Sequence, residues 1–376
     1  MGCNLNMKKI LFLIHDLGHG GAEKVLVNLV NNMDRTKFDI TVMALFGGGV
    51  NEQFLAEHIR LIVCHKKPIR GNSHIMKLFT PKQLYRYYIK EKYDIVVSYL
   101  EGPSARIVSG CDDPDAKLVS WIHIEQKTKQ RAAGSFRNYS EALKCYNRFD
   151  RTVCVSDTVR QDFLKLVPLE KTVEVLYNTN ESAKIMSQAT ENVPTGIFSH
   201  DEIKLIGVGK ILKNKGFDRV ARIHKRLRDE GYPVHTYILG VGPQQDEISQ
   251  YLQENTLTDS FTFLGYQTNP YKYVSKCDLF ICASHSEGFS TAATEALIVG
   301  TPVCTVEVSG MKEMLGENNE WGIVTDNDED ALYQGIKKLL DDPKLLAHYK
   351  EKAVERGKMF STENTVKAVE DMLLSL

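Results

Sequence analysis

The sequence predicts an α/β protein made of two doubly wound domains that face each other across a cleft. Three observations predict this fold class. The chain has 376 residues, which is more than one core usually holds. Short, evenly apolar runs typical of buried parallel strands alternate with helical patterns along both halves. The alternation stops once, over residues 178–202, where a polar stretch with one glycine and one proline predicts a linker.

Most elements are expected from runs of apolar residues bounded by turn residues. A helix is expected over 22–33, where Val25, Leu29, Val30 and Met33 lie on one face. The expected strands of the first half are 10–14, 39–45, 60–64, 94–100, 117–123, 152–156 and 173–177. Those of the second half are 203–209, 234–240, 261–265, 278–284 and 302–306, with a helix over about 216–230 and helices from about 328 onward.

The charge is divided unevenly between the two halves. Residues 1–180 hold 26 Lys and Arg against 19 Asp and Glu, a formal charge of +7, whereas the remaining residues carry −8. This contrast supports two domains and suggests that the first half meets an anionic ligand. The eight cysteines are scattered without a C-x-x-C pair, as expected of small buried residues in a reducing cytoplasm. No apolar run approaches the ~20 residues of a membrane-spanning helix.

Ligands of doubly wound sheets bind beyond the carboxyl ends of strands, so the residues that follow each expected strand are candidates. In the first half, Gly20 and Gly21 precede a helix that opens near Ala22. Such glycines and helix-start N–H groups can bind phosphate, and a plain tight turn is the alternative. The spacing is not G-x-G-x-x-G, so a dinucleotide is not indicated. His123 ends another strand and either points into the cleft or is a core histidine.

Two lysines follow the first strand of the second half. Lys210 and Lys215 lie in a turn between Gly209 and the Gly216 that opens the next helix. Two ammonium groups near a helix start can clamp a diphosphate. Solvated surface lysines are the alternative.

The stretch ICASHSEGFSTAATEALIVGTPV holds two acids, Glu287 and Glu295. Gly288 places Glu287 in the loop after a strand, and Ser290 or Thr291 suits the N-cap of the helix that contains Glu295. At ~1.5 Å of rise per residue the two carboxylates are roughly 10 Å apart, too far for an acid/base pair at one bond. They suit the two ends of a long ligand with an anion between them, such as a nucleotide sugar. Acids that merely favour a helix start are the alternative.

The segment SHSEGFSTAATEALIVGTPV resembles the Glu-x7-Glu motif of the retaining glycosyltransferases of family 4. The resemblance runs the whole length: GHGGAEK is similar to the family's Gly-Gly-Ala-Glu opening, VGKILKNKGFD to its Val-Gly-Arg-Leu…Lys-Gly element, ILGVGPQQDEI to its Gly-x-Gly-Pro turn, FLGY to its Phe-Leu-Gly and SGMKEML to its Gly-x-x-Glu. It implies the GT-B fold of two Rossmann-like domains. Residues 1–180 would bind the acceptor, 181–355 would bind the nucleotide sugar, and 356–376 would form a helix that crosses back to the first domain.

The resemblance implies transfer of a hexose from a nucleotide sugar, most readily a UDP-sugar, to a glycan or lipid-linked acceptor in surface polysaccharide synthesis. The expected catalytic residues are His123 near the transferring sugar, Glu287 on its hydroxyls, and Lys210 and Lys215 on the diphosphate. Glu295 would bind the ribose, and the backbone near Leu264 to Tyr266 would meet the base. The expected donor-binding residues are Gly20, Gly21, Gly209, Leu264, Gly265, Tyr266, Gly288, Phe289, Ser290, Thr291 and Glu295.

Three positions depart from the family pattern. Lys210 stands where the family usually has Arg, so a bidentate phosphate contact becomes a point charge. Thr179 replaces the glycine of the usual hinge, and Ser290 replaces a common glycine next to the sugar, which leaves the sugar open.

The expected mechanism needs no metal or other cofactor, because Lys210, Lys215 and the helix starts supply the positive charge that a departing diphosphate requires. Asp113-Pro114-Asp115 imitates a D-x-D metal motif, but it lies in a polar turn and is interpreted as a loop. No carboxylate is clearly placed as a covalent nucleophile. We therefore hypothesise front-side attack by the acceptor, with retention of the anomeric configuration.

The acceptor side is least defined by the sequence. Residues 65–92 carry eight Lys and Arg against one acid, interleaved with aromatic residues. They suit an anionic membrane surface or a lipid diphosphate at the inner face of the membrane, and a solvated helix face is the alternative. Nucleic acid is not expected, because no binding motif accompanies these residues. The competing functions are a sugar-nucleotide epimerase or phosphorylase on the same fold, and a non-catalytic binding subunit.

Overall fold

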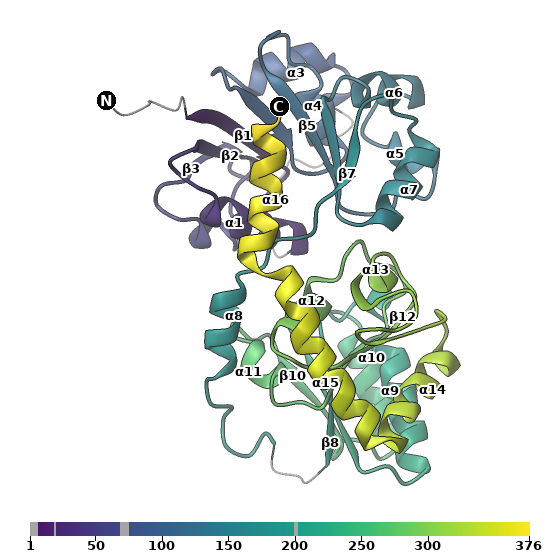
Figure 1. Cartoon of the computed structure of the whole chain (residues 1–376). Coiled ribbons are helices and arrows are strands. Elements are labelled where there is room, and N and C mark those ends of the chain that lie inside the picture. Colours follow the sequence, from purple (N-terminus) through teal and green to yellow (C-terminus); the bar gives the residue numbers. More distant parts are fainter. Residues whose placement is uncertain (1–6, 19, 68–74, 199–201) are drawn as a thin grey trace. The chain divides into compact units, whose positions relative to one another are not determined.

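The computed structural model describes residues 7–18, 20–67, 75–198 and 202–376. The chain forms two compact units: Met1–Asn180 with Thr362–Leu376, and Glu181–Ser361. Each unit is a parallel sheet with helices packed against it (Figure 1). The expected fold class, two doubly wound α/β domains, is confirmed.

The first unit is built on a sheet whose described strands follow the order β3-β2-β1-β4-β5-β6-β7, and all neighbours run parallel. β1 pairs with both β2 and β4, so the strand order reverses between β1 and β4. The strands are β1 (Lys8–Ile14), β2 (Phe38–Phe46), β3 (Arg60–His65), β4 (Ile95–Ser98), β5 (Lys117–Ile122), β6 (Arg151–Cys154) and β7 (Val173–Val175).

The helices of the first unit bury one face each against the sheet or a neighbouring helix. In α1 the expected stripe is observed, because Val25, Leu29 and Val30 are buried. The last helix of the chain, α16, belongs to this unit, and Glu370 on it accepts a hydrogen bond from the backbone N–H of Asp34 at 2.6 Å. The helices are α1 (Gly21–Asn32), α3 (Pro81–Tyr88), α4 (Pro103–Val108), α5 (Lys129–Ala132), α6 (Tyr139–Tyr146), α7 (Asp157–Leu166) and α16 (Thr362–Leu374).

The second unit is built on a sheet with the order β10-β9-β8-β11-β12-β13 over its described strands, again parallel throughout. β8 pairs with both β9 and β11, so the order reverses between β8 and β11. The strands are β8 (Ile203–Val208), β9 (Val234–Leu239), β10 (Phe261–Gly265), β11 (Leu279–Cys282), β12 (Val303–Val306) and β13 (Ile323–Thr325). The helices are α8 (Ser182–Ala189), α9 (Phe217–Asp229), α10 (Gln245–Glu254), α11 (Tyr271–Val274), α12 (Thr291–Ile298), α13 (Met311–Leu315), α14 (Glu329–Asp341) and α15 (Pro343–Gly357).

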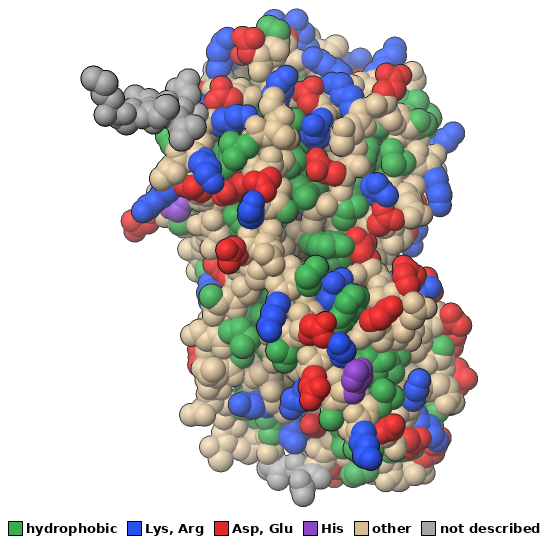
Figure 2. Space-filling view, viewed as in Figure 1, with side chains coloured by type: hydrophobic (Ala, Val, Ile, Leu, Met, Phe, Trp, Pro, Cys, Tyr) green, Lys and Arg blue, Asp and Glu red, His purple; other side chains and the backbone are tan. Residues whose placement is uncertain are grey.

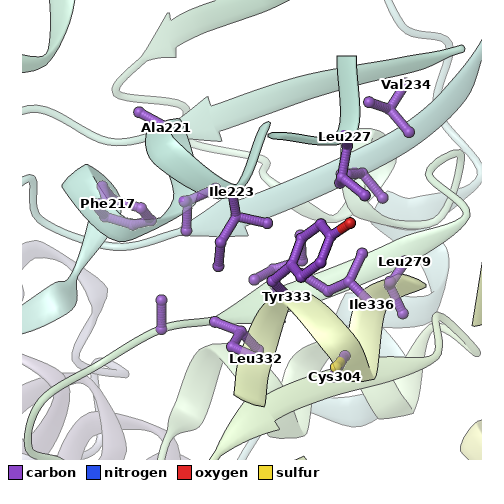
Figure 3. Close-up of a cluster of buried hydrophobic side chains, with 14 of the residues drawn as sticks. Phe217, Ala221, Ile223, Leu227, Val234, Leu279, Cys304, Leu332, Tyr333 and Ile336 are labelled. Carbon is purple, nitrogen blue, oxygen red and sulfur yellow. The ribbon is translucent and has the colours of Figure 1, made fainter. Parts of the chain in front are cut away.

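The core of the second unit joins two helices to the sheet (Figure 3). Ile223 and Leu227 of α9 and Tyr333 and Ile336 of α14 are buried together with side chains of the strands. Cys304 of β12 is part of this cluster and is fully buried. The seven described cysteines are free thiols and six of them are buried, in agreement with their interpretation as small apolar residues.

Three expectations about elements need correction. The polar linker 178–202 contains α8, because Ile185 and Ala189 lie one turn apart and bury a single face. The strand β13 was not expected, because only three of its residues pair. Residues 356–361 lie in the second unit rather than in the C-terminal helix. Arg356 is buried there, where its guanidinium donates to the carbonyl oxygens of Met314 and Glu313, each at 2.7 Å.

Candidate active site

The candidate residues of the second unit come from loops at the carboxyl edge of its sheet. The loop after β8 carries Gly209, Lys210 and Lys215, and the loop after β11 carries Glu287. These are the loops on either side of the point where the strand order reverses, which is where open α/β sheets bind ligands.

Gly216 brings these two loops together. Its φ of +68° is one that side chains rarely adopt, and a Cβ there would lie 2.0 Å from the carbonyl oxygen of Ala283. Only glycine therefore lets the loop after β8 approach the end of β11 so closely. Lys215 precedes Gly216 and is partly buried, whereas Lys210 is exposed.

Lys215 and Glu287 form an ion pair across this contact. The Lys215 Nζ lies 2.6 Å from Glu287 Oε1, and both side chains are mostly buried. The same oxygen accepts a hydrogen bond from Ser284 Oγ at 2.7 Å. Charge-assisted bonds of this kind fix a carboxylate more firmly than neutral ones. Glu287 is therefore held by one cation and one hydroxyl through a single oxygen.

Ser290 is the N-cap of α12, which decides between the two residues that the sequence left open. Its Oγ accepts from the backbone N–H of Ala293 at 3.3 Å. Phe289 is buried beside Gly310, where a Cβ would lie 2.6 Å from the Phe289 ring. The hydroxyl oxygen of Ser290 is thus engaged in capping the helix that carries Glu295.

Glu295 lies inside α12 and is buried, with Tyr271 Oη donating to its Oε1 at 3.3 Å. Tyr271 is the first residue of α11, and its own N–H donates to the side chain of Asn269 at 3.1 Å. A buried carboxylate with a hydroxyl partner is well placed to accept from a second hydroxyl, such as a ribose.

The end of β10 carries the remaining donor-binding candidates of this unit. Gly265 has a φ of +67°, and its carbonyl oxygen accepts from the N–H of Gly240 at 2.9 Å. The carbonyl oxygen of Leu264 accepts from the side chain of Gln267 at 2.7 Å. Tyr266 is exposed at this edge of the sheet.

Gly20 and Gly21 lie at the start of α1 in the first unit. Gly20 is the N-cap, and its φ of −81° is open to any residue. A Cβ at Gly20 would lie 1.8 Å from a carboxylate oxygen of Glu23. The glycine therefore makes room for the Glu23 carboxylate beside the start of α1.

His123 follows β5 in the first unit. Its backbone N–H donates to Glu101 Oε2 at 3.0 Å, and its ring lies 4.9 Å from that of Tyr99. Removal from water lowers the pKa of His123 to about 3, although a hydrogen bond with the Tyr99 backbone acts in the opposite direction. Burial likewise raises the pKa of Glu101. His123 Nε2 is buried and has no hydrogen-bond partner among the described residues.

Ser284, Tyr271 and Glu101 were missed by the sequence analysis, although each contacts a predicted residue. Ser284 lies three residues before Glu287, and this local spacing is a signal that could have found it. Tyr271 and Glu101 lie more than twenty residues from their partners, so only the fold reveals them.

The described residues contain no group of three or more His, Cys, Asp or Glu side chains that could hold a metal ion. In the Asp113-Pro114-Asp115 turn, the Asp113 side chain accepts from the N–H of Asp115 at 3.2 Å and pairs with Lys92 at 3.1 Å. These contacts are those of a polar turn, in agreement with the interpretation of residues 113–115 as a loop.

Part of the basic segment 65–92 is paired with acids. Lys82 and Arg86 of α3 both contact Asp112, at 3.2 and 2.5 Å, and their side chains remain exposed. Lys and Arg side chains lie at the end of the first unit where α3 is found, with acidic side chains between them (Figures 1 and 2). Residues 68–74 of this segment lie outside the described residues. No helix within the described ranges combines the length and apolar character needed to span a membrane.

Two family models match the chain. The model of Glycosyltransferase Family 4 matches residues 19–179, and that of Glycosyl transferases group 1 matches residues 189–356. Together they cover most of both units.

Several relatives match nearly the full chain, and two of them are described here. One is the N-acetylgalactosamine-N,N'-diacetylbacillosaminyl-diphospho-undecaprenol 4-alpha-N-acetylgalactosaminyltransferase of Campylobacter jejuni, which is 27% identical over 98% of this chain and 99% of that protein. Another is the lipopolysaccharide core biosynthesis glycosyltransferase LpsD of Rhizobium meliloti, which is 25% identical over 96% of each chain.

Solved structures show the same fold. The Anabaena protein HepE in complex with UDP superposes with a TM-score of 0.79 at 19% identity, over 98% of this chain and 100% of that one. The sucrose-phosphate synthase of Thermosynechococcus elongatus superposes with a TM-score of 0.75 at 17% identity, over 98% of each chain.

Proposed function

We propose that this chain, which is a glycosyltransferase of the two-domain GT-B type, moves a hexose-type sugar from a UDP-sugar to a glycan or lipid-linked acceptor with retention of the anomeric configuration. The observation that carries the proposal is the Lys215–Glu287–Ser284 arrangement at the reversal point of the second sheet. A cation and a fixed carboxylate within 2.6 Å of each other can bind two parts of one nucleotide sugar. Lys215 would bind the diphosphate, and Glu287 would bind the sugar hydroxyls.

The donor would lie along the carboxyl edge of the second sheet. Glu295, held by Tyr271, would accept from the ribose, and the backbone from Leu264 to Tyr266 would meet the base. The UDP complex of HepE and the diphospho-undecaprenol acceptor in the name of the Campylobacter relative support a UDP-sugar and a lipid-linked acceptor. The lipopolysaccharide core biosynthesis in the name of LpsD also supports a role in the synthesis of surface glycans.

The chemistry would depend on charge stabilisation rather than on a covalent intermediate. As the bond between the anomeric carbon and the phosphate oxygen breaks, negative charge grows on the diphosphate, and Lys215 and Lys210 would stabilise it. Because Lys215 and Ser284 both engage one oxygen of Glu287, the proposal gives this residue the role of a hydroxyl-binding group rather than a nucleophile. The acceptor hydroxyl would attack from the side of the departing phosphate and pass its proton to it. The cations of the chain itself perform this task, so the proposal includes no metal.

For the acceptor side, we propose that the enzyme is cytoplasmic and that residues 65–92 contact the inner face of an anionic membrane. Exposed Lys82 and Arg86 on α3 support this contact, and the free thiols of the described cysteines support a reducing compartment.

The test is a screen of UDP-, GDP- and ADP-sugars, with binding measured by calorimetry and slow donor hydrolysis measured by release of the nucleoside diphosphate. We expect a UDP-sugar to bind and to be hydrolysed slowly without acceptor. A chain that binds no nucleotide sugar would exclude the proposal, and turnover that requires added phosphate would favour a phosphorylase. The anomeric coupling constant of the product, read by NMR, tests retention.

A further inference from the structure

The loop 283–290 between β11 and α12 carries Glu287 and is bound on one side by the segment that follows β8. The backbone N–H of His285 donates to the carbonyl oxygen of Asn214 at 2.8 Å. Lys215 pairs with Glu287 at 2.6 Å. These contacts fix the backbone and the carboxylate of the loop, and they leave the exposed ring of His285 to be bound from elsewhere.

Arg219 of α9 binds this ring. Its Nη2 lies 2.5 Å from His285 Nδ1, and its Nη1 donates to Asn327 Oδ1 at 2.8 Å. A guanidinium has only donors and keeps its proton, so His285 Nδ1 must be the acceptor of this bond. His285 is therefore a neutral imidazole whose single proton lies on Nε2.

Arg219 is the first of three arginines on one face of α9. Arg222 and Arg226 follow three and seven residues later, and they pair with acids at the start of α14, Glu329 at 2.7 Å and Asp330 at 2.8 Å. Arg219 contacts a neutral amide and a histidine instead, and within the described ranges it forms no ion pair with an acid. Its role therefore differs from that of the two arginines that join α9 to α14.

The helix α9 gives Arg219 a rigid base. The other face of α9 is buried in the core of the second unit, where Ile223 and Leu227 lie with side chains of α14 and of the strands (Figure 3). Groups that start from a packed helix are positioned more precisely than groups on a loop. An arginine on α9 is thus suited to fix the loop that carries Glu287.

The charges around His285 favour its neutral form. Partial removal of the ring from water and the positive charge of Arg219 lower the pKa of His285, Lys213 and Arg222 act in the same direction, and Asp218 opposes them. A proton on Nδ1 would remove the acceptor and place a second positive charge against the guanidinium. Acidification should therefore break the contact.

We propose that Arg219 is a positioning residue for the sugar transfer: it donates to neutral His285 and so fixes the loop that carries Glu287, and protonation of His285 breaks this contact. The inference rests on the proposed function, because it assigns Glu287 a place in that reaction. The contact between Arg219 and His285 can be observed without a nucleotide sugar.

The first test is the slow hydrolysis of the UDP-sugar, measured by release of UDP. Arg219→Met should lower kcat on the order of tenfold, because Glu287 is then less well placed at the reacting centre. KM should stay within about twofold, since Lys215 still binds the diphosphate. Arg219→Lys keeps a charged donor and should restore part of the rate. Arg226→Met removes the same charge from the same helix face and should leave kcat and KM unchanged.

A double-mutant cycle tests whether Arg219 acts through His285. His285→Ala should lower kcat as Arg219→Met does, and the double variant should lose no more than either single one, because both changes break the same contact. His285→Asn keeps an acceptor and cannot gain a proton. The wild type should lose turnover as the pH falls below the ordinary histidine value of about 6.5, whereas this loss should be absent in His285→Asn.

NMR of the full chain with isotope-labelled histidine tests the contact in the absence of substrate. The His285 signals, identified by their absence in His285→Asn, should show a proton on Nε2 alone. The pKa of His285 should rise in Arg219→Met, because a neighbouring positive charge is removed. Amide hydrogen exchange of residues 284–288 should be faster in Arg219→Met than in the wild type.

The outcomes separate the two proposals. A proton on His285 Nδ1, or additive losses of kcat in the double variant, would overturn the role of Arg219. Wild-type kcat in Arg219→Met would do the same. The expected proton position and exchange rates, in a protein that binds no nucleotide sugar, would support the fixing of the loop and overturn the proposed function instead.

Discussion

The carboxyl edges of the two sheets hold their candidate residues in different ways. In the second unit the side chains satisfy one another, as Lys215 and Ser284 do for Glu287 and Tyr271 does for Glu295. In the first unit His123 is held through its backbone by Glu101, and its buried Nε2 has no partner among the described residues. A ligand that binds Glu287 or Glu295 must therefore exchange existing bonds, whereas the His123 ring lies against Tyr99 and its buried nitrogen is closed to solvent. The second unit can thus be selective, because a ligand without matching hydroxyl groups leaves a buried carboxylate short of a partner, whereas in the first unit burial sets the protonation of the histidine.

The largest effect is expected for Glu287→Gln. The amide keeps the shape and the bond from Ser284, but it loses the charge pair with Lys215. Turnover should fall on the order of 10²- to 10³-fold, as for removal of one preorganised polar group at a reacting centre. Donor affinity, measured by calorimetry, should change only a few-fold. The exposed Glu317→Gln is the matched control, and wild-type turnover in Glu287→Gln would show that the residue has another role.

Lys215→Met should mainly weaken donor binding. A charge-assisted bond to the diphosphate is worth about 1.5–3 kcal/mol, which is roughly 10- to 150-fold in affinity. The exposed Lys210→Met should have a smaller effect, because water screens its charge. Titration of UDP into both variants checks this order. Equal losses of UDP affinity would show that Lys215 binds the diphosphate no more strongly than Lys210 does.

The burial of His123 leads to a prediction about pH. The pKa of His123 is lowered to about 3 in the fold and is about 6.5 in an unfolded chain, so the unfolded chain binds the extra proton. The stability due to the neutral imidazole is complete above pH 6.5 and is lost as the pH falls towards 3. Between pH 6.5 and 5 the free energy of unfolding should drop by up to about 2 kcal/mol from this residue. Chemical denaturation at both pH values should show a smaller drop in His123→Asn, and an equal drop would exclude a buried neutral histidine.

Glu295→Gln should reduce UDP affinity about tenfold, since one hydrogen bond to a charged acceptor becomes neutral. Tyr271→Phe removes the hydroxyl that orients Glu295 and should cost only a few-fold, because the bond is long at 3.3 Å. Calorimetry with UDP and with uridine checks both values. Loss of sugar transfer without loss of UDP binding would show that Glu295 does not bind the ribose.

The smallest effect on turnover is expected for Ser284→Ala. Lys215 still holds the same oxygen of Glu287, so turnover should fall about two- to tenfold while donor affinity is kept. Ser284→Thr retains the hydroxyl and should restore most of the rate. Failure of this rescue would assign Ser284 to packing rather than to the position of Glu287.

The sequence was informative where one strand or one loop decides the structure. Buried strands such as β1 and β8 lie within one or two residues of the expected ends, because parallel strands are apolar on both faces. The N-cap of α12 was narrowed to two residues by local chemistry alone.

What the sequence could not predict depends on contacts between distant segments. Lys215 and Glu287 are 72 residues apart, and only the approach at Gly216 makes them a pair. The helix α8 was missed because two buried residues give too weak a period in a polar stretch. Buried Arg106 of α4 donates to the carbonyl oxygen of Met76 and to Glu141 of α6, and the separate sequences of these three segments carry no sign of the contact.

The position of α16 has a consequence for how the protein can be divided. Because this helix belongs to the first unit, that unit is discontinuous in the sequence and the chain passes between the units twice. The two passages start at neighbouring points, since Thr362 Oγ1 donates to the carbonyl oxygen of Asn180 at 2.7 Å. A fragment that ends at residue 180 therefore lacks part of its own fold, whereas 181–361 is continuous. A protease cut between residues 180 and 181 would therefore leave the two fragments associated only through the packing of α16 against residues 1–180.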